Sequence, residues 1–235
     1  MAGAEALPAC TLVDCLCAVH APATPAAERL RATQHLEAFK QRAHEHLPEL
    51  LALVAPLRAA QERHFAMHTL VELVRARWPS LAELRRAELK ALALQLVGLL
   101  GEAAEPAFIA GAAVRLVCEL AVREWPQRWP ELVDELLRAA ERSPRHAALA
   151  LECMSSLADE VREHTSARLP DARHAELCKS LEAVSAHVAA RAHACAADAL
   201  AHLRACTSAA EAGAEEAAEL VLSLIHISEP TRRTP

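Results

Sequence analysis

Apolar residues recur along most of the chain with the spacing of one face of an α-helix. Between residues 24 and 43, for example, the apolar stripe runs through Ala32, Leu36 and Phe39, and polar residues occupy the opposite side. The same spacing continues for the whole of the stretch from Pro170 to Cys206. The pattern predicts helices at 9–20, 24–43, 47–54, 57–78, 80–101, 105–125, 130–142, 144–164 and 170–206.

Local signals mark several of the expected helix ends. Ser80 and Glu83 have the spacing of a capping box, which predicts that a helix begins there, and Gly101 predicts where it ends. The chain has three tryptophans, and each one precedes a proline. Since proline disfavours the α conformation in the residue before it, each pair predicts a helix end. The pairs are Trp78-Pro79, Trp125-Pro126 and Trp129-Pro130.

The tryptophan segments also repeat one another. A shift of 47 residues places VELVRARWP (71–79) on CELAVREWP (118–126). A period of about 40–47 residues with two helices per unit is typical of HEAT-type repeats. We therefore predict an all-α protein, a right-handed α-solenoid of HEAT-type helix pairs with four to five repeats. We expect the indoles to be buried at the joints between repeats.

Composition narrows the class of protein further. Apolar residues make up 53% of the 235 residues, tyrosine is absent and glycine occurs five times, which favours helices over strands. The net charge of −6 makes the chain as a whole a poor electrostatic ligand for nucleic acid. The apolar runs are too short to cross a bilayer, and the start lacks the features of a signal peptide. We expect a soluble intracellular protein without membrane insertion, whose eight cysteines are free thiols.

Candidate chemistry is sparse. His64 and His68 lie one helical turn apart with Glu72 on the same face, and Cys195, His202 and Cys206 share another face. Both groups have side chains that bind zinc, but ordinary helix positions explain them better, because neither has the ligand set of a known zinc site. No phosphate-binding loop and no nucleophile–base pair stands out. We expect no enzymatic activity, no metal and no cofactor.

Several motifs resemble those of a known family. Four segments occur in the order and with the spacing found in exportins of the importin-β (karyopherin) superfamily. They are RHFAMHTLVELVRARW (63–78), REWPQRWPELVDEL (123–136), SSLADEVREHT (155–165) and Leu169-Pro170. The resemblance covers about residues 25–190 and is greatest to the exportin-five branch. The exportin that carries leucine-rich signals shares the double Trp-Pro and is the nearest alternative.

The resemblance implies a nuclear transport receptor that shuttles between nucleus and cytoplasm through the nuclear pore. Partners implied for the full-length receptor are Ran-GTP, cargo such as structured double-stranded RNA (microRNA precursors, some tRNA) and proteins, and FG-repeat nucleoporins. The inner helices of the first repeats contact Ran in this family. Residues of those helices outside their apolar stripes become candidates for Ran binding. They are Arg31, Gln34, His35, Arg42, Arg63, His64 and Arg75, with most weight on Arg63 and His64.

The family is several times longer than this chain, and the resemblance therefore predicts an N-terminal fragment. We expect an importin-β/exportin-like N-terminal HEAT-repeat domain at 1–208 and an Ala/Glu-rich end at 209–221. The last stretch, LSLIHISEPTRRTP (222–235), resembles the translation of a sequencing adapter. Two other interpretations stay open: a general HEAT scaffold or importin-type adaptor that binds a protein partner, and a helical metalloprotein or redox protein built on the His and Cys residues.

Overall fold

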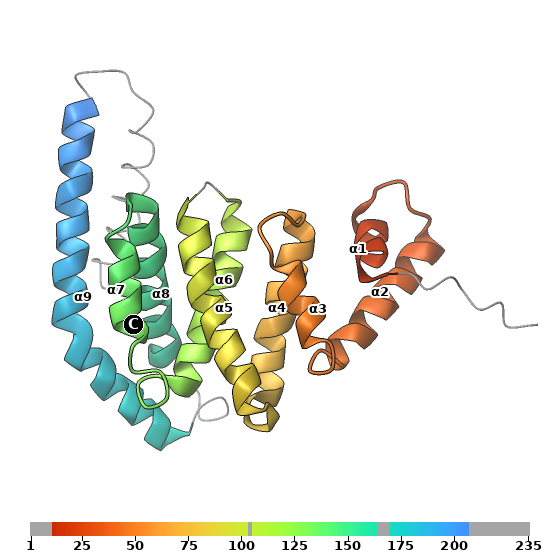
Figure 1. The fold of residues 1–235 in the computed structure, drawn as a ribbon, viewed down its shortest axis with the longest axis horizontal. Coiled ribbons are helices and arrows are strands. Elements are labelled where there is room, and N and C mark those ends of the chain that lie inside the picture. Colours follow the sequence, from red (N-terminus) through yellow and green to blue (C-terminus); the bar gives the residue numbers. More distant parts are fainter. Residues whose placement is uncertain (1–10, 103–104, 164–169, 207–235) are drawn as a thin grey trace, which may run out of the picture. The chain divides into compact units, whose positions relative to one another are not determined.

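The computed structural model describes residues 11–102, 105–163 and 170–206, and these ranges consist of helices connected by turns (Figure 1). They contain nine α-helices and one short 3-10 helix, and no strand occurs within them. Contacts divide the chain into two units, residues 1–81 and 82–235, which are described separately. The prediction of an all-α protein is confirmed.

Unit 1 consists of two helix pairs. Helix α1 packs on α2, α3 packs on α4, and α1 also contacts α4. The first pair encloses a small apolar core of Cys15, Leu16, Ala32 and Leu36, against which Phe65 of α4 packs. The elements of unit 1 are α1 (Leu12–His20), α2 (Ala26–Gln41), α3 (Leu47–Leu53), α4 (Ala60–Arg77) and the 3-10 helix η1 (Trp78–Ser80).

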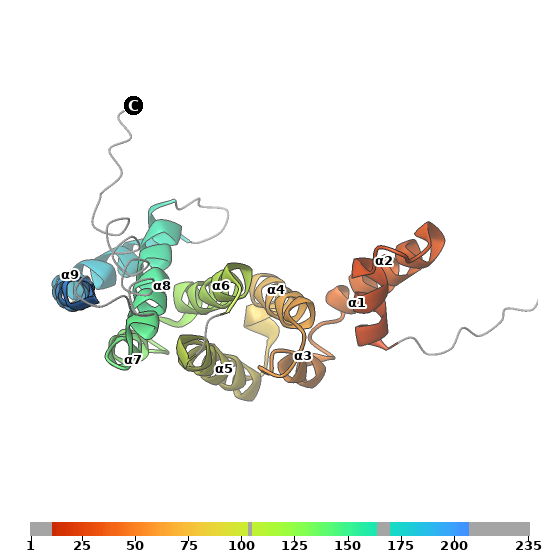
Figure 2. The same ribbon diagram turned by 90° about the horizontal axis from the view of Figure 1, so that it is seen from above.

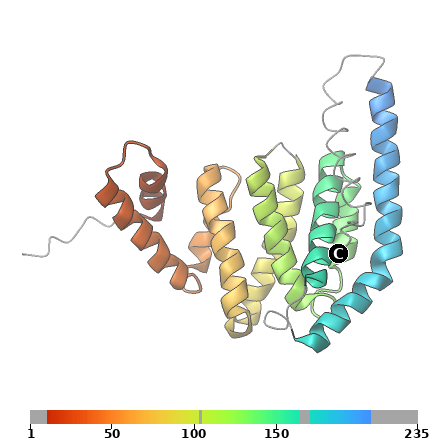
Figure 3. The ribbon, with the colours of Figure 1, turned by 180° about the vertical axis from the view of Figure 1, so that it is seen from behind.

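Unit 2 is organised around one central helix. The elements of unit 2 are α5 (Glu83–Glu102), α6 (Ala107–Glu124), α7 (Leu132–Ala140), α8 (Pro144–Arg162) and α9 (Asp171–Cys206). Helix α8 contacts the four other helices of the unit. Viewed from above, it lies between α6 and α9 (Figure 2). The long helix α9 runs beside α7 and α8, as the view from behind also shows (Figure 3).

Successive helices pair in the order that the HEAT-type interpretation predicted. The pairs are α1/α2, α3/α4, α5/α6 and α7/α8, and α9 follows the last of them. Apolar residues on one face of each helix bury these contacts, so that helix packing in each unit follows from the sequence stripes. The prediction of HEAT-type helix pairs is confirmed.

Side chains cap some helix starts, but not the one that the sequence suggested. Thr11 and Asp14 form a capping box at α1: Asp14 N donates to Thr11 Oγ1 (3.2 Å) and Thr11 N donates to Asp14 Oδ2 (3.0 Å). Ser80 does not cap α5. It lies in η1, where its hydroxyl donates to the carbonyl of Arg77 (2.8 Å), and α5 begins only at Glu83. The prediction of a capping box at Ser80 and Glu83 is therefore wrong.

The Trp-Pro pairs mark the ends of two helices. Helix α4 ends directly before Trp78 and α6 directly before Trp125. Trp125 adopts the extended backbone expected before proline, with ψ of 141°. Trp78 instead keeps helical dihedral angles (φ −48°, ψ −48°) and starts the 3-10 turn. Proline at the second position of that short helix is tolerated because its missing N–H is not needed there.

The remaining expectations concern the end of the chain, membrane insertion and the cysteines. The proposed segments 209–221 and 222–235 lie outside the described residues. In the described part, no helix is long and apolar enough to cross a membrane. Six cysteines within it are free thiols, of which Cys17 and Cys178 are exposed and the other four are buried.

Candidate functional site

Helix α2 presents one polar face. Arg31, Gln34 and Arg42 are exposed, while Ala32, Leu36 and Phe39 on the opposite face are buried; His35 is exposed as well. Arg31 Nε donates to the carbonyl of Ala27 (3.3 Å), and Arg42 Nε donates to Glu45 Oε2 (3.0 Å). The hydrogen bond from Arg42 lowers the pKa of Glu45, so that this carboxylate stays ionised. Both arginines bond only within their own stretch of chain in these contacts and keep their charged ends near solvent.

Helix α4 presents a second polar stripe. His64, His68, Glu72 and Arg75 follow one another at intervals of four, four and three residues, which places them on one side of the helix. The rings of His64 and His68 lie 6.3 Å apart between centroids, and Arg75 Nη1 lies 3.3 Å from Glu72 Oε1. In the described part of the chain, no group of three or more His, Cys, Asp or Glu side chains is arranged to hold a metal ion.

Arg63, to which the resemblance gave most weight, lies on the other side of α4. It is only 4% exposed, and it continues a buried stripe of Met67, Leu70 and Val74. The intervals of four, three and four residues fix this placement, because such positions share a helix face. The arginine is therefore the least accessible of the seven candidates, whereas His64 next to it is half-buried.

Aromatic contacts join the two candidate helices. Phe39 at the end of α2 packs against Phe65 near the start of α4, with ring centroids 6.2 Å apart. Phe39 also stacks on His46 at 4.8 Å, and Lys40 Nζ lies 5.7 Å from the centre of the Phe65 ring. These contacts bring the helices that carry the candidates together within unit 1.

All three tryptophans are buried: Trp78 is 5% exposed, Trp125 2% and Trp129 4%. The prolines that follow them are more accessible, Pro79 and Pro130 being exposed and Pro126 half-buried. Buried indoles with solvent-facing prolines identify the motif as part of the core rather than as an exposed binding surface.

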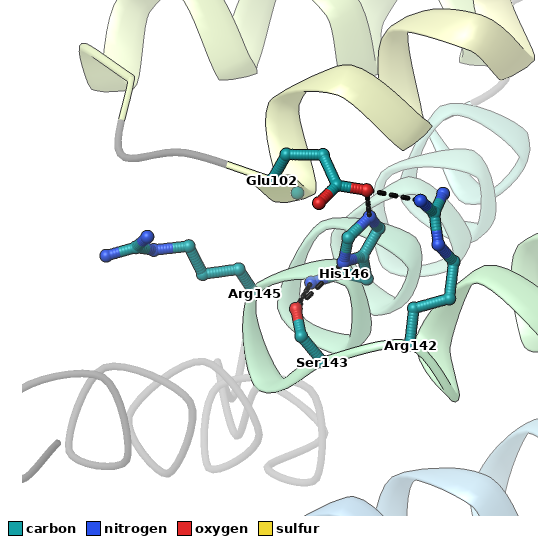
Figure 4. Close-up of a pocket in the computed structure, with 6 residues that line it drawn as sticks. Glu102, Arg142, Ser143, Arg145 and His146 are labelled. Atoms are coloured by element: carbon teal, nitrogen blue, oxygen red, sulfur yellow. Dashed lines mark hydrogen bonds and ion pairs between the residues drawn. The ribbon is translucent and has the colours of Figure 1, made fainter.

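A polar cavity of unit 2 lies where the end of α5 meets the start of α8 (Figure 4). It measures about 380 Å³. Glu102 from α5 forms a close ion pair with Arg142 and lies 3.8 Å from His146 Nε2. Arg145 points away from these groups (Figure 4). The lining residues are Gly101, Glu102, Arg142, Ser143, Arg145 and His146.

His146 is buried in this cavity and bonded at both ring nitrogens. Its Nε2 lies 3.0 Å from the carbonyl oxygen of Gly98, and its Nδ1 lies 2.8 Å from Ser143 Oγ. A carbonyl can only accept, so Nε2 carries the proton and Nδ1 accepts from the hydroxyl. Ser143 Oγ in turn accepts from the backbone N–H of His146 (3.3 Å) as the N-cap of α8. The Ser–His pair is therefore a helix cap that ties α8 to α5, and its hydrogen bonds are all used in the fold.

Gly101 allows this close approach. A Cβ atom at this position would lie 2.2 Å from Cδ2 of His146, closer than any real contact. The glycine was predicted to end its helix, but α5 continues to Glu102, and no glycine among the described residues has a positive φ. Its small size is therefore what the fold requires, rather than its conformational freedom.

Two buried thiols face one another across α6 and α8. Cys118 Sγ donates to the carbonyl of Cys153 (3.5 Å), and burial raises the pKa of both thiols. Raised pKa values keep them protonated, and a protonated thiol is a poor nucleophile and a poor metal ligand. These two cysteines therefore act as small core residues.

Several residues at these sites carried no local signal in the sequence. Lys90, Arg173 and His146 bond to groups 34 to 51 residues away in the chain. Periodicity reports which face of a helix is apolar, but it cannot show which distant carbonyl a cation reaches. The burial of Arg63, by contrast, could have been predicted, because its spacing from Met67 and Leu70 places it on the apolar face of the helix.

Comparisons with known proteins identify the family. The model of the family described as Exportin 1-like protein matches residues 106–225. Exportin-5 of Homo sapiens is 30% identical over 155 residues, which cover 65% of this chain and 13% of that protein. Exportin-5 of Mus musculus is 29% identical over 172 residues (72% and 14%), and Exportin-5 of Dictyostelium discoideum is 28% identical over 162 (68% and 14%). The chain thus spans about a seventh of the length of these relatives. A family match over half of its residues, on a fold of HEAT-type helix pairs, shows that the chain belongs to the exportin 1-like family.

Proposed function

We propose that this chain forms the N-terminal, Ran-GTP-binding repeats of a nuclear export receptor. In this proposal the full-length receptor exports structured RNA, such as microRNA precursors and some tRNA, together with protein cargo. It shuttles between nucleus and cytoplasm and contacts FG-repeat nucleoporins on the way. The chain acts by binding alone, without a catalytic step.

The single observation that carries the proposal is the family match over residues 106–225. The relatives named Exportin-5 support the choice of branch, since those of two mammals and of Dictyostelium discoideum have similar identities to this chain. The Ser143–His146 cap is compatible with a role in binding alone, because its polar atoms are used in its own hydrogen bonds.

We assign Ran binding to the two polar stripes of unit 1. Arg31, Gln34 and Arg42 on α2 and Arg75 on α4 combine exposure with the capacity to donate hydrogen bonds to a partner. The ion pairs of Arg42 with Glu45 and of Arg75 with Glu72 join residues within one helical turn, and such pairs cost little to exchange for bonds to a partner. We assign Arg63 no direct contact with Ran, since its burial leaves little of it accessible.

The test is to measure binding of the full chain to Ran loaded with GTP and with GDP. We expect binding to the GTP form and at least about ten-fold weaker binding to the GDP form. The double variant Arg31→Glu/Arg42→Glu should weaken GTP-form binding by about ten-fold or more, since each substitution places a like charge against a surface that attracts cations. Equal binding to both forms would favour the general HEAT scaffold instead.

A matched control comes from unit 2. Arg138 of α7 is as exposed as Arg42, with side chains 69% and 64% accessible, and it also pairs with a glutamate three residues away. Arg138→Glu should leave Ran binding within about two-fold, since single exposed charges act weakly at a distance. If Arg138→Glu weakens binding as much as the double variant, the partner recognises net charge and the assignment to α2 fails.

RNA cargo is tested on the longer receptor. The chain carries a net charge of −6, and on its own it should bind structured RNA weakly and with a small dependence on salt. We expect RNA affinity to require the rest of the receptor and Ran-GTP together.

A further inference from the structure

The segment that follows helix α6 is bonded from two different helices. We call residues 122–130 the Trp-Pro turn; it contains the last residues of α6 and two of the three buried tryptophans, Trp125 and Trp129. The last carbonyls of a helix have no partner within the helix itself, and side chains or water must satisfy them. In this turn cations from α5 and from α9 supply several of the missing donors.

Arg173 binds the turn from α9. Its Nε donates to the carbonyl of Val122 (3.0 Å), one Nη donates to the carbonyl of Trp125, and the other donates to the side chain of Gln127. Glu176, one turn further along α9, holds the same guanidinium at 2.6 Å. Only 16% of the arginine side chain is exposed. A planar guanidinium suits this role because its donors point in several fixed directions at once.

Lys90 binds the turn from α5. Its ammonium donates to the carbonyl of Arg128 (2.9 Å) and lies 3.4 Å from Glu124 Oε2. The Glu124 side chain is fully buried, and Arg128 Nη1 approaches its other oxygen at 3.8 Å. A buried carboxylate is stable only when cations and donors surround it, and Lys90 is one of the cations that stabilise Glu124 in the turn.

The acceptors of the two cations are interleaved along the turn. Arg173 bonds to residues 122, 125 and 127, and Lys90 bonds to residues 124 and 128. Residue 124 therefore lies between two acceptors of Arg173, and residue 128 directly follows a third. A displacement of the backbone that breaks one set moves the other set as well, because only one or two residues separate them.

From this arrangement we propose that the Trp-Pro turn is a two-sided clasp that couples helix α5 to helix α9. Each cation holds the backbone in the conformation that the other cation needs, so both sides close together or open together. Such coupling between groups that share a network is a general property of buried polar clusters. A movement of α9 would thereby reach α5 across the intervening helix pair. This inference concerns a mechanical link within unit 2 and does not depend on Ran binding.

The test is a double-mutant cycle read by hydrogen exchange in the full chain. Lys90→Met, Arg173→Met and the double variant keep apolar bulk and remove the donors. Exchange is measured in peptides that cover residues 122–130. Each single variant should accelerate exchange by about 10- to 30-fold, as expected from the loss of charged hydrogen bonds. If the clasp is a single unit, the double variant should stay within about three-fold of the faster single variant.

Two outcomes would overturn the proposal. The first is a double variant whose acceleration equals the product of the single effects, on the order of 100-fold or more, because the two sides would then act independently. The second is an equal acceleration in peptides from the middle of α8, which would mean that the substitutions merely destabilise the whole unit. Arg162→Met is the matched control: this arginine of α8 is exposed and pairs with Asp159 in the same turn (2.6 Å), and its replacement should change exchange by less than two-fold.

A second variant covers the possibility that Arg173→Met fails to fold. Arg173→Lys keeps the charge but cannot reach acceptors on three residues, and circular dichroism establishes that each variant is helical. In the same cycle with Lys90→Met, this variant should again give less than the product of the single effects. Tryptophan emission supplies an independent measure when Trp78 is replaced by Phe, because the two remaining indoles both lie in the turn. Unchanged emission and quenching in a variant whose exchange rises would contradict an opening of the turn.

Discussion

Two cations of unit 1 and two cations of unit 2 serve different purposes. In unit 1, Arg42 and Arg75 extend into solvent and pair with a glutamate three residues away on their own stretch of chain. In unit 2, Lys90 and Arg173 are largely buried and donate to carbonyls between 38 and 51 residues away. A short-range pair in solvent stabilises little and exchanges readily, whereas a long-range bond from a buried cation to a backbone carbonyl is part of the fold.

This difference gives a rule for choosing binding residues in helical repeats. Arg75 and Arg173 are the same residue type with the same charge, so that residue type alone would make them equally good candidates for binding a partner. What separates them is the partner: a side-chain carboxylate can be exchanged for a ligand, but an orphan carbonyl at a helix end needs its donor in every state. By its burial, Arg63 belongs with the cations that are part of the fold rather than with those available to a partner.

The largest effect should come from the core of the clasped turn. Replacing Trp125, which is 2% exposed, by alanine should reduce the free energy of unfolding by about 3–5 kcal/mol, as truncation of a buried aromatic does. Urea unfolding followed by circular dichroism measures this loss. Leu84→Ala is the control, since this leucine is 69% exposed and should matter by less than about 0.5 kcal/mol. A loss below about 1 kcal/mol for Trp125→Ala would show that the turn does not depend on its indole.

A smaller loss should follow from removing one buried charge. Glu124→Gln keeps the shape of the side chain but cancels its attraction to Lys90 and Arg128. We expect a loss of about 1–3 kcal/mol in the free energy of unfolding, because a buried cation is left with a weaker partner. Asp159→Asn, which breaks only an exposed pair, should cost less than about 0.5 kcal/mol. Equal losses of unfolding free energy in both variants would show that the buried ion pair stabilises the fold no more than the exposed one.

Two glycines should respond with opposite signs to the same substitution. Gly101→Ala places a methyl group against the His146 ring and should destabilise the protein by about 1–3 kcal/mol. Gly111→Ala meets nothing within 4 Å and should stabilise α6 by up to about 1 kcal/mol, because alanine favours the helix. Thermal unfolding of both variants measures the signs. Stabilisation by Gly101→Ala would mean that the end of α5 moves away from His146 at little cost.

The buried thiols predict a pH dependence of stability. Burial raises the pKa of Cys118 and Cys153 in the folded state, so above the ordinary thiol value of 9.0 the unfolded chain releases protons that the folded chain keeps. The free energy of unfolding should therefore fall as pH rises above 9, by up to about 1.4 kcal/mol per pH unit for each thiol. Urea unfolding at pH 8 and pH 10 measures this slope. The variant Cys118→Ala/Cys153→Ala should show a shallower slope; an unchanged slope would contradict the assignment.

The smallest effect belongs to the solvated stripe. Arg75→Ala should change the free energy of unfolding by less than about 0.5 kcal/mol, since its bond to Glu72 lies on the surface of α4. Under the proposed function the same variant should weaken Ran-GTP binding. The pair of measurements separates the two roles. A loss of more than about 1 kcal/mol would move Arg75 into the group of cations that the fold requires.

Most of the fold could be predicted because helix packing here follows local periodicity. The apolar stripes placed all of the helices within about three residues of their observed bounds, as for the helix expected at 105–125 and found at Ala107–Glu124. Helix caps were harder, since Ser80 matched the spacing of a capping box but was drawn into the 3-10 turn that Trp78 begins. Local motifs compete with one another, and the winner depends on contacts outside the motif.

The candidate sites were less predictable for a related reason. Exposure of the α2 stripe followed from periodicity, but the weight given to Arg63 came from a family motif and overlooked its helical register. Lys90, His146 and Arg173 could not have been found, because each acts on a group that only tertiary structure brings near. The sequence thus predicts which face of a helix is exposed, whereas hydrogen bonds between side chains and distant backbone carbonyls become visible only in the structure.

The reach of α9 has a consequence for how this protein is made. Side chains of α9 donate to carbonyl ends of α6 (Arg173 to Val122), α7 (Arg191 to Ala140) and α8 (His174 to Val161). Translation delivers those three helices first, and their final carbonyls must stay hydrated until α9 leaves the ribosome. Helix α9 therefore completes the hydrogen bonding of the three helices that precede it. A nascent chain stalled before Asp171 should expose all three helix ends to chaperones and proteases, and release of the stall should protect them together.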